Sequence, residues 1–304
     1  MASPGHLYVC GTPIGNLEDI TLRALRVLRE VSLIAAEDTR HTRKLLSHYG
    51  IETPLISLHE HNEARRTPEI LRRLLAGESV ALVSDAGMPG IQDPGAGLVR
   101  AAVDAGVPVT VIPGPTALIT ALVGSGLPAE RFAFEGFLPR QSRQRRAHLE
   151  TLARDPRTLV FYEAPHRLRE VLADMLAVLG DRPACIAREL TKVHEEWQRD
   201  TLSRLAQLWQ DRTPQGEFVI LVAGAASGDT APAMAASGEE VVERVLACMR
   251  DGLDKKAAVR AVAAQLGLPR RVVYQVAMSI PAGKASSFDP RPPASDVPDD
   301  PLHR

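Results

Sequence analysis

The sequence predicts an α/β protein with two α/β domains followed by a small helical unit. Three observations predict this fold class. Short apolar runs of strand character alternate with helical segments over the first 112 residues, and a Gly/Pro-rich joint at 124–128 precedes a second such set. An Ala/Ser/Gly-rich stretch, 225–238, then leads into a segment with helical patterns alone. Strands that alternate with helices favour a mostly parallel sheet covered on both faces.

The first 117 residues are expected to form the N-terminal α/β domain. Apolar runs bounded by turn residues mark its strands, and apolar residues spaced three or four apart mark its helices. The expected strands are 7–10, 33–36, 54–58, 80–83 and 107–112, and the expected helices are 21–31, 40–49, 68–76 and 98–105.

Residues 118–224 are expected to form the second α/β domain, and a helix predicted over 116–123 leads into it. The same patterns identify its other elements. The expected strands are 132–137, 158–162, 184–187 and 217–223, and the expected helices are 144–153, 166–179 and 202–210.

The remaining residues divide into a linker, a helical unit and a tail. The linker is 225–238, and the helical unit, 239–280, has expected helices at 239–250, 255–266 and 270–280, with Asp254 as the N-cap of the second. Two short helices joined by the turn Gly267-Leu268-Pro269 are typical of a helix-turn-helix, and equally of a small helical docking domain. The proline-rich tail 281–304 shows no core pattern and is expected to be disordered.

Composition excludes several classes of protein. A formal net charge of −1 argues against a protein that coats nucleic acid, so any such contact must come from local basic patches. The three cysteines, Cys10, Cys185 and Cys248, lie far apart, which excludes a zinc ribbon and suits a reducing compartment. No signal-like segment and no apolar run of about 18 residues occurs. We therefore expect a cytoplasmic protein without a membrane span.

Three loops rich in glycine and proline each follow an expected strand of the first sheet. They are 11–16, 84–95 and 113–117. Because the carboxyl ends of strands in an open α/β sheet meet at one edge, we expect the loops to converge on one small-molecule crevice. A phosphate loop is excluded by the missing Gly-Lys-Ser/Thr ending. A dinucleotide fingerprint is not indicated, because the Gly-x-Gly at 95–97 does not follow a strand and reaches no third glycine.

These motifs resemble the tetrapyrrole methylase superfamily and, within it, the branch that methylates small-subunit ribosomal RNA. The resemblance covers roughly residues 5 to 224, and the helical unit also fits that branch. It implies a two-domain fold with a mostly parallel first sheet and a mixed second sheet. The segments that carry it are 11–16, 36–40, 84–95, 113–117, 161–167, 188–192 and 216–220.

The resemblance implies S-adenosylmethionine as methyl donor and the ribose 2′-hydroxyl of a cytidine in 16S ribosomal RNA as acceptor. It also implies a homodimer that acts on this RNA or on the assembled small subunit, with the donor held between the α/β domains. The implied donor contacts are Pro13, Ser84, Asp85, Ala86, Gly87, Ile91, Thr116 and Ala117, with Tyr162 and Ala187 closing over them. Met88 stands where the family often has a small hydroxyl residue, so no hydrogen bond is expected from that side chain.

Methyl transfer from a sulfonium needs alignment and exclusion of water rather than a metal, and we expect no metal site. A base or a nearby cation can help to deprotonate a ribose hydroxyl. Three pairs are candidates, each with an ordinary alternative as surface charge, ion pair or helix cap: Glu189 with Lys192, Glu163 with His166, and Glu37 with Asp38. Glu189 and Lys192 are preferred as catalytic residues, because opposite charges three residues apart after a strand suit the mouth of a cleft.

Clusters of basic residues are the expected contacts to RNA phosphates. They are Arg40, Arg43 and Lys44; Arg140, Arg143, Arg145 and Arg146; Arg167; and, in the helical unit, Lys255, Lys256, Arg270 and Arg271. A charge run is often only a solvated face, so the segment 140–146 is the strongest of these. Aromatic residues make up 4% of the chain, which argues against a large stacking platform for bases.

Two other functions are compatible with parts of the sequence. The same fold can methylate a tetrapyrrole, although a small planar substrate needs neither the arginine cluster nor the helical unit. A helix-turn-helix regulator that senses S-adenosylmethionine without catalysis is the second alternative, and it would leave most of the chain as an oversized sensor.

Overall fold

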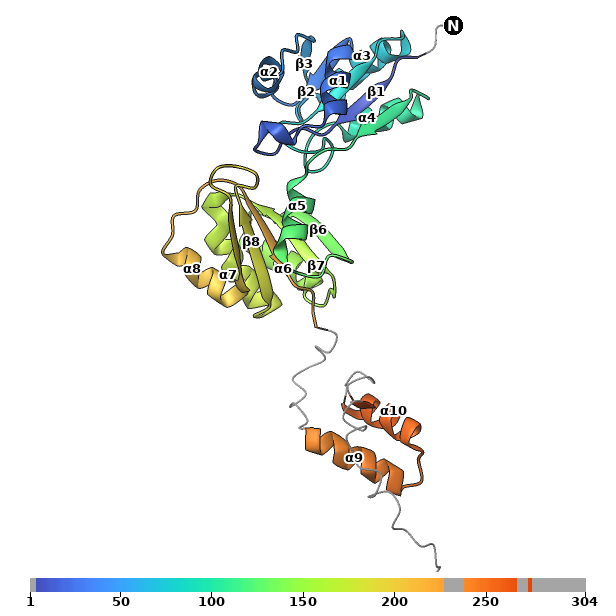
Figure 1. Ribbon diagram of the computed structural model, residues 1–304, viewed down its shortest axis with the longest axis vertical. Coiled ribbons are helices and arrows are strands. Elements are labelled where there is room, and N and C mark those ends of the chain that lie inside the picture. The colour runs from blue at the N-terminus through green and yellow to red at the C-terminus, as the bar shows by residue number, and fades with distance from the viewer. Residues whose placement is uncertain (1–3, 227–237, 267–272, 275–304) are drawn as a thin grey trace, which may run out of the picture. The chain divides into compact units, whose positions relative to one another are not determined.

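The computed structural model describes residues 4–226, 238–266 and 273–274. The chain divides into two compact units, residues 1–225 and 226–304. The first unit contains two sheets with helices packed on them, and the second contains two described helices (Figure 1). In the part of the chain that is described, no helix is long and apolar enough to cross a membrane.

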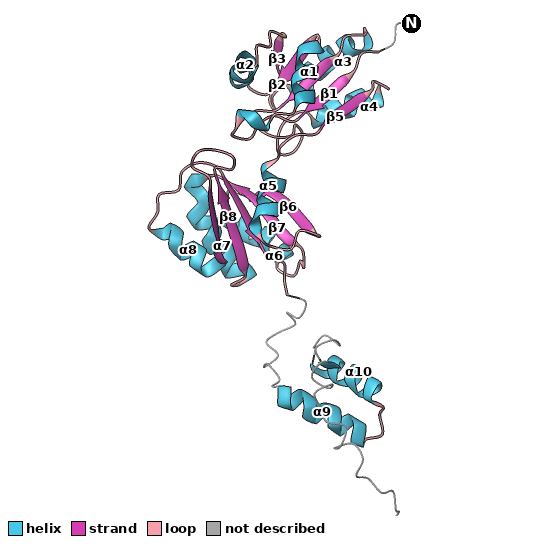
Figure 2. Cartoon of the chain, viewed as in Figure 1, coloured by secondary structure: helices cyan, strands magenta, loops and turns pink. Residues whose placement is uncertain are grey.

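The first sheet consists of five parallel strands in the order β3-β2-β4-β1-β5. Its strands are β1 (Leu7–Cys10), β2 (Leu33–Ala36), β3 (Leu55–Ser57), β4 (Val80–Val83) and β5 (Val109–Ile112). Alternate strand residues pack against α1 (Leu22–Glu30) with α2 (Thr39–His48) and against α3 (Glu63–Leu75) with α4 (Ala96–Asp104). Figure 2 shows these helices in cyan around the magenta strands. Strands β2 and β4 are buried throughout, as a parallel sheet between two helical layers requires. The parallel α/β arrangement expected from the sequence is confirmed.

The order of the strands determines where the loops leave the sheet. Strand β1 lies between β4 and β5, although these strands are far apart in the sequence. Since all the strands are parallel, the loops after β1, β4 and β5 emerge side by side at the carboxyl edge.

The second sheet is mixed, as the resemblance implied, with the strand order β6-β7-β10-β8-β9. Strands β6 and β7 are parallel and the other neighbours are antiparallel. Its strands are β6 (Phe132–Phe137), β7 (Thr158–Glu163), β8 (Pro183–Arg188), β9 (Glu196–Thr201) and β10 (Phe218–Val222). One face packs on α6 (Ser142–Leu152), α7 (Leu168–Leu179) and α8 (Leu202–Gln210), and the other on α5 (Ala117–Ser125). Because α5 packs on β8 and β10, we propose 1–117 and 118–224 as the domains of this unit.

Two elements differ from the sequence-based expectation. Strand β9 was not predicted, because its residues are mostly polar and it lies at the sheet edge, where apolar alternation is weak. Helix α3 begins at Glu63, five residues before the predicted start at Pro68. Proline usually occupies the first turn of a helix, whereas here it lies inside one. Two short 3₁₀ helices, η1 (Leu17–Asp19) and η2 (Pro165–Arg167), complete the unit.

The second unit contains α9 (Gly238–Arg250) and α10 (Lys255–Leu266), packed through valines and alanines that include Val245 and Val262. Asp254 caps α10 as predicted, since its Oδ1 accepts the N–H of Ala257 at 2.6 Å. Of the third expected helix, only residues 273–274 are described, and both are helical. Most of the proposed linker 225–238 and all of the proposed tail 281–304 lie outside the described residues.

Candidate active site

The three loops of the first sheet meet directly. Thr12 and Gly87 exchange backbone hydrogen bonds of 2.8 and 3.1 Å, which join the loop after β1 to the loop after β4. The loop after β5 touches the first loop through glycine. A Cβ placed on Gly11 would lie 2.7 Å from the Cα of Gly114, closer than any side chain allows. The predicted convergence of the loops is confirmed.

The long loop after β4 is held by buried polar side chains at its start and by a carboxylate at its end. The Thr12 hydroxyl donates to the carbonyl of Ser84 at 3.1 Å. At the other end, Glu63 Oε1 accepts the N–H groups of Gly97 and Leu98 in the first turn of α4. A carboxylate at a helix N-terminus satisfies free N–H groups and complements the helix dipole. The loop is therefore fixed to the body of the domain at both ends.

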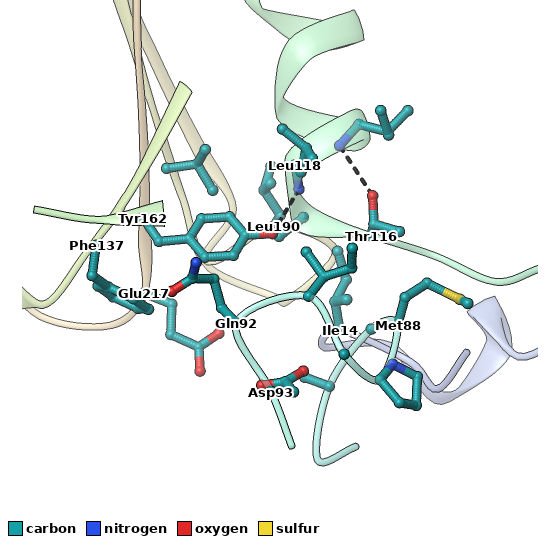
Figure 3. A pocket seen from close by; sticks show the side chains of 18 of the residues that line it. Ile14, Met88, Gln92, Asp93, Thr116, Leu118, Phe137, Tyr162, Leu190 and Glu217 are labelled. Carbon is teal, nitrogen blue, oxygen red and sulfur yellow. Dashed lines mark hydrogen bonds between the residues drawn. The ribbon is translucent and has the colours of Figure 1, made fainter. Parts of the chain in front are cut away.

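A cavity of about 1030 Å³ lies where this loop faces the second sheet (Figure 3). Its walls come from the loop after β4, from α4 and α5, and from the ends of β6, β7 and β10. The residues that line it are mainly apolar or contribute backbone, among them Ile14, Met88, Leu118, Leu190 and Val219. A largely apolar cavity with few polar groups is typical of a small-molecule site.

The expected donor contacts divide into two groups. Six of them line the cavity: Ala86, Gly87, Ile91, Thr116, Ala117 and Tyr162. Four are not among the lining residues: Pro13, Ser84, Asp85 and Ala187. Ser84 and Ala187 are buried, and Asp85 Oδ1 accepts the N–H of Asp38 at 3.0 Å. Asp85 therefore ties the loop after β4 to the end of β2.

Tyr162 connects the second sheet to the start of α5. Its hydroxyl accepts the N–H of Leu118 at 3.1 Å (Figure 3). Its ring meets those of Phe134 and Phe137 edge to face. Burial raises the pKa of Tyr162, so the phenol stays neutral and keeps one proton to donate. Phe137 is 51% exposed and also lines the cavity.

Asp93, in the loop 84–95, is a cavity-lining carboxyl group that was not among the expected site residues. Burial raises the pKa of Asp93 to about 6, and the negative charges of Glu37 and Asp85 add to the rise. A hydrogen bond with Ser84 partly offsets this. The pKa of Glu37 is also raised, by burial and by Asp85. The sequence gives no sign of this raised pKa, because the shift depends on burial and on carboxylates that the fold brings together from the loops after β2 and β4.

The preferred catalytic pair, Glu189 and Lys192, forms an ion pair outside the cavity lining. The Lys192 ammonium lies 2.9 Å from Glu189 Oε1 and 3.0 Å from Glu217 Oε2. Glu189 Oε1 also accepts the N–H of Glu217 at 2.9 Å. These donors lower the pKa of Glu189, although burial opposes them. The contacts among Glu189, Lys192 and Glu217 hold the loop after β8 against the start of β10.

The other two candidate pairs have structural partners as well. Asp38 caps α2, where its Oδ1 accepts the N–H of Arg40 at 2.8 Å. The Glu163 side chain is fully buried, and its Oε1 accepts the N–H of Ala164 at 2.8 Å. Burial raises the pKa of Glu163. Neither Glu37, Asp38 nor His166 lines the cavity.

The basic residues expected to contact RNA lie in different environments. Arg40, Arg43, Lys44, Arg140 and Arg143 are exposed. Arg167 is mostly buried and donates to the carbonyls of Leu138 and Pro139. Arg146 is half-exposed and paired with Asp174.

Arg145 corrects one expectation. Its side chain is 2% exposed and lies 2.7 Å from Asp174 Oδ2, so its guanidinium cannot meet a phosphate in this conformation. The density of arginines in 140–146 did not reveal this, because the partner lies on α7, 29 residues away. Arg145 joins α6 to α7 instead.

Comparison with known proteins relates this geometry to a family. The model of tetrapyrrole (corrin/porphyrin) methylases matches residues 6–206, and the RsmI C-terminal HTH domain matches residues 235–280. Ribosomal RNA small subunit methyltransferase I of Synechocystis sp. is 49% identical over 279 residues, covering 91% of this chain and 99% of that protein. Its namesake in Xylella fastidiosa is 50% identical over 279 residues, covering 90% and 99%.

Among solved structures, uroporphyrin-III C-methyl transferase from Thermus thermophilus, complexed with S-adenyl homocysteine, superposes with a TM-score of 0.52. It is 23% identical and covers 71% of this chain and 97% of that one, a likeness that shows the fold alone. The fold is therefore that of the tetrapyrrole methylases. The chain belongs to the tetrapyrrole methylase family, in the group of ribosomal RNA small subunit methyltransferase I.

Proposed function

We propose that this protein transfers a methyl group from S-adenosylmethionine to the ribose 2′-oxygen of a cytidine in 16S ribosomal RNA. The observation that carries the proposal is the cavity between the converging loops and the second sheet. It occurs in a chain about half identical to proteins named ribosomal RNA small subunit methyltransferase I, over nine tenths of its length. The 2′-oxygen and the cytidine rest on the motif resemblance.

The cavity suits S-adenosylmethionine in size and in chemistry. Pockets for drug-sized ligands have volumes of about 300–1,000 Å³, and this cavity of about 1030 Å³ is slightly larger. The residues that would contact the donor are Ala86, Gly87, Ile91, Thr116, Ala117 and Tyr162. Pro13, Ser84, Asp85 and Ala187 would act indirectly, by holding these walls in place. In particular, Gly87 with a φ of +81° lets the loop backbone approach a ligand.

The chain's own contribution to the reaction is alignment and exclusion of water. The bound donor supplies a methyl group on a positively charged sulfur, which is already activated. The apolar lining keeps water away from the reacting atoms, and the anchored loop after β4 holds the site rigid. Glu189 and Lys192 support this by fixing the loop that carries Leu190 in the cavity wall. We therefore propose a positioning role for that pair.

The exposed basic residues supply the RNA contacts in this proposal. Arg43, Lys44, Arg140 and Arg143 are exposed and can meet phosphates, while the exposed Arg40 is paired with Asp38 at 2.8 Å and the half-exposed Arg146 with Asp174. Phosphate contacts of this kind position RNA without reading its sequence. Arg167 would act through the cavity wall, since it braces the segment after β6.

A homodimer is the second part of the proposal. Strand β5 is an edge strand, and valines are exposed on β5 (Val111), on α4 (Val103) and on α5 (Val123); the first two also line the cavity. An exposed apolar edge of this kind favours association between copies. Light scattering of the purified chain tests this, with twice the monomer mass expected. We place the protein in the cytoplasm, where its ribosomal substrate is made.

The function is tested by offering the full-length protein isotope-labelled donor with three acceptors: unmodified small subunits, naked 16S RNA and a tetrapyrrole precursor. Label is expected in the RNA, at a cytidine whose 3′-phosphodiester resists alkali because the attacking hydroxyl is blocked. Label only in the tetrapyrrole overturns the proposal. Tight binding to duplex DNA with no transfer to any acceptor favours a regulator and overturns it as well.

A further inference from the structure

Five titratable side chains belong to residues that line the cavity: Asp93, Arg100, Tyr162, Glu163 and Glu217. Four of them have a partner within the chain. Arg100 lies 3.4 Å from Asp104, and Glu217 lies 3.0 Å from Lys192. The Tyr162 hydroxyl accepts a backbone N–H, and the Glu163 side chain is fully buried, with one oxygen on a backbone N–H.

Asp93 differs from these four. Its side chain is hydrogen-bonded to the neutral Ser84 hydroxyl but, within the described ranges, makes no ion pair, and the charged groups that act on it are the carboxylates of Glu37 and Asp85. Glu37 approaches it from the end of β2 and Asp85 from the end of β4, while the neutral Tyr162 faces it from β7. His59 interacts with Glu37, and the His61 ring lies 6.1 Å from the His59 ring. Figure 3 shows the Asp93 side chain projecting from the loop after β4 among the residues that line the cavity.

We propose that Asp93 is the general base of the reaction, the group that takes the proton from the ribose 2′-hydroxyl as the methyl group is transferred. This inference rests on the proposed function. In the step, the bond from the 2′-oxygen to the methyl carbon forms while the carbon–sulfur bond breaks and its electron pair stays on sulfur. The hydroxyl proton passes to the Asp93 carboxylate, which becomes the neutral acid and later releases the proton to solvent.

The surroundings of Asp93 suit this role. A ribose hydroxyl is a weak acid, and a base works best when its pKa lies near the pH of the reaction. Burial and the adjacent carboxylates bring the pKa of Asp93 to about 6, so the group is mostly ionised at neutral pH yet binds a proton readily. Glu189 is less suited to act as the base, because Lys192 and the backbone N–H of Glu217 lower its pKa and so hold its carboxylate in the ionised form.

The competing role for Asp93 is a counter-charge to the donor's ammonium or sulfonium group. The two roles differ in what the substitution Asp93→Asn changes. Loss of a base lowers kcat and removes the acidic limb of the pH profile while donor affinity stays within about twofold. Loss of a counter-charge weakens donor affinity by about tenfold or more and leaves the shape of the kcat profile unchanged.

The experiment measures kcat on small subunits from about pH 5 to about pH 9, and donor affinity by calorimetry. Wild-type protein is expected to lose activity with one proton as the pH falls through about 6. D93N is expected to lose about 10²- to 10⁴-fold in kcat and to lack that limb, and D93E to recover part of the rate. In ligand-free protein, the Asp93 carboxyl carbon observed by NMR should titrate with a midpoint near 6.

The matched control is Asp104→Asn, an exposed aspartate on α4 that should keep both the rate and the acidic limb. Wild-type kcat in D93N, an acidic limb that persists, or an effect confined to donor affinity overturns the inference. If wild-type protein transfers no label to subunits, the proposed function fails and the role of Asp93 fails with it. If wild-type protein methylates subunits but D93N gives one of these contrary results, the role of Asp93 fails and the proposed function stands.

Discussion

Gly11 and Gly114 lie back to back, and their contact joins two loops that leave neighbouring strands. A Cβ on Gly114 would come within 2.8 Å of the Cα of Gly11, and a Cβ on Gly11 within 2.7 Å of the Cα of Gly114. Both obstructing atoms belong to backbone, which cannot rotate away as a side chain can. The wall that carries Thr116 and Ala117 thus keeps its distance from the first loop only if both positions lack a side chain.

The substitution Gly114→Ala tests the importance of this contact. We expect it to lower the free energy of unfolding by about 1–3 kcal/mol through overpacking, and to weaken donor binding because the loop after β5 must shift. Urea unfolding and calorimetry measure the two effects. The matched control is Gly50→Ala, where a φ of +61° adds strain but no atom lies within 4 Å. Equal donor affinity in G114A and wild type would remove the contact from the site.

Asp85 provides the second prediction. We expect Asp85→Ala to weaken donor binding even though Asp85 does not line the cavity, because its Oδ1 holds the N–H of Asp38 at 3.0 Å. The lost hydrogen bond should cost about 1.5–3 kcal/mol of stability, since the acceptor is charged. In Asp85→Asn the amide oxygen can still accept, so we expect most of the donor affinity to return in calorimetry. If D85N binds the donor as weakly as D85A, the charge of Asp85 matters and not its hydrogen bond.

Local sequence patterns and contacts between distant residues contributed differently to these results. The strands and the loops that begin at Gly11, Ser84 and Pro113 could be predicted from sequence, because apolar patterns and glycine determine local structure within a few residues. The loops converge because of the order of the strands, and the rules for connecting parallel strands allow only a few such orders. The proposed role of Asp93 could not be predicted from sequence. Its pKa depends on burial and on two carboxylates that are distant in the chain, Asp85 at 8 residues and Glu37 at 56. The cap that Glu63 places on α4 is equally invisible from local sequence.

The raised pKa of Asp93 also predicts a dependence of stability on pH. A carboxyl group whose pKa is higher in the folded state, about 6 here against about 3.9 unfolded, favours the folded state when protonated. Wild-type stability should therefore fall as the pH rises from about 4 to about 6 and then level off, as far as this group is concerned. D93N lacks that penalty, so we expect it to be the more stable protein at pH 7.5 and to lose the advantage below about pH 4. Thermal unfolding over this range measures it, and a D93N protein less stable than wild type at pH 7.5 contradicts it.

Arg145 and Arg143 lie two residues apart on α6, but replacing each by methionine should affect different properties: the stability of the protein for Arg145 and the binding of small subunits for Arg143. Arg145→Met removes a guanidinium that lies 2.7 Å from the buried Asp174, whereas Arg143 is exposed. Breaking a buried ion pair costs about 3–5 kcal/mol, and we expect the lower end because Arg146 still pairs with Asp174. Arg143→Met should leave urea unfolding unchanged, but should weaken binding to small subunits and reduce the slope of log affinity against log salt by about 1. A stable R145M protein with a reduced salt slope would return Arg145 to the RNA-binding surface, because only an arginine that reaches phosphate affects that slope.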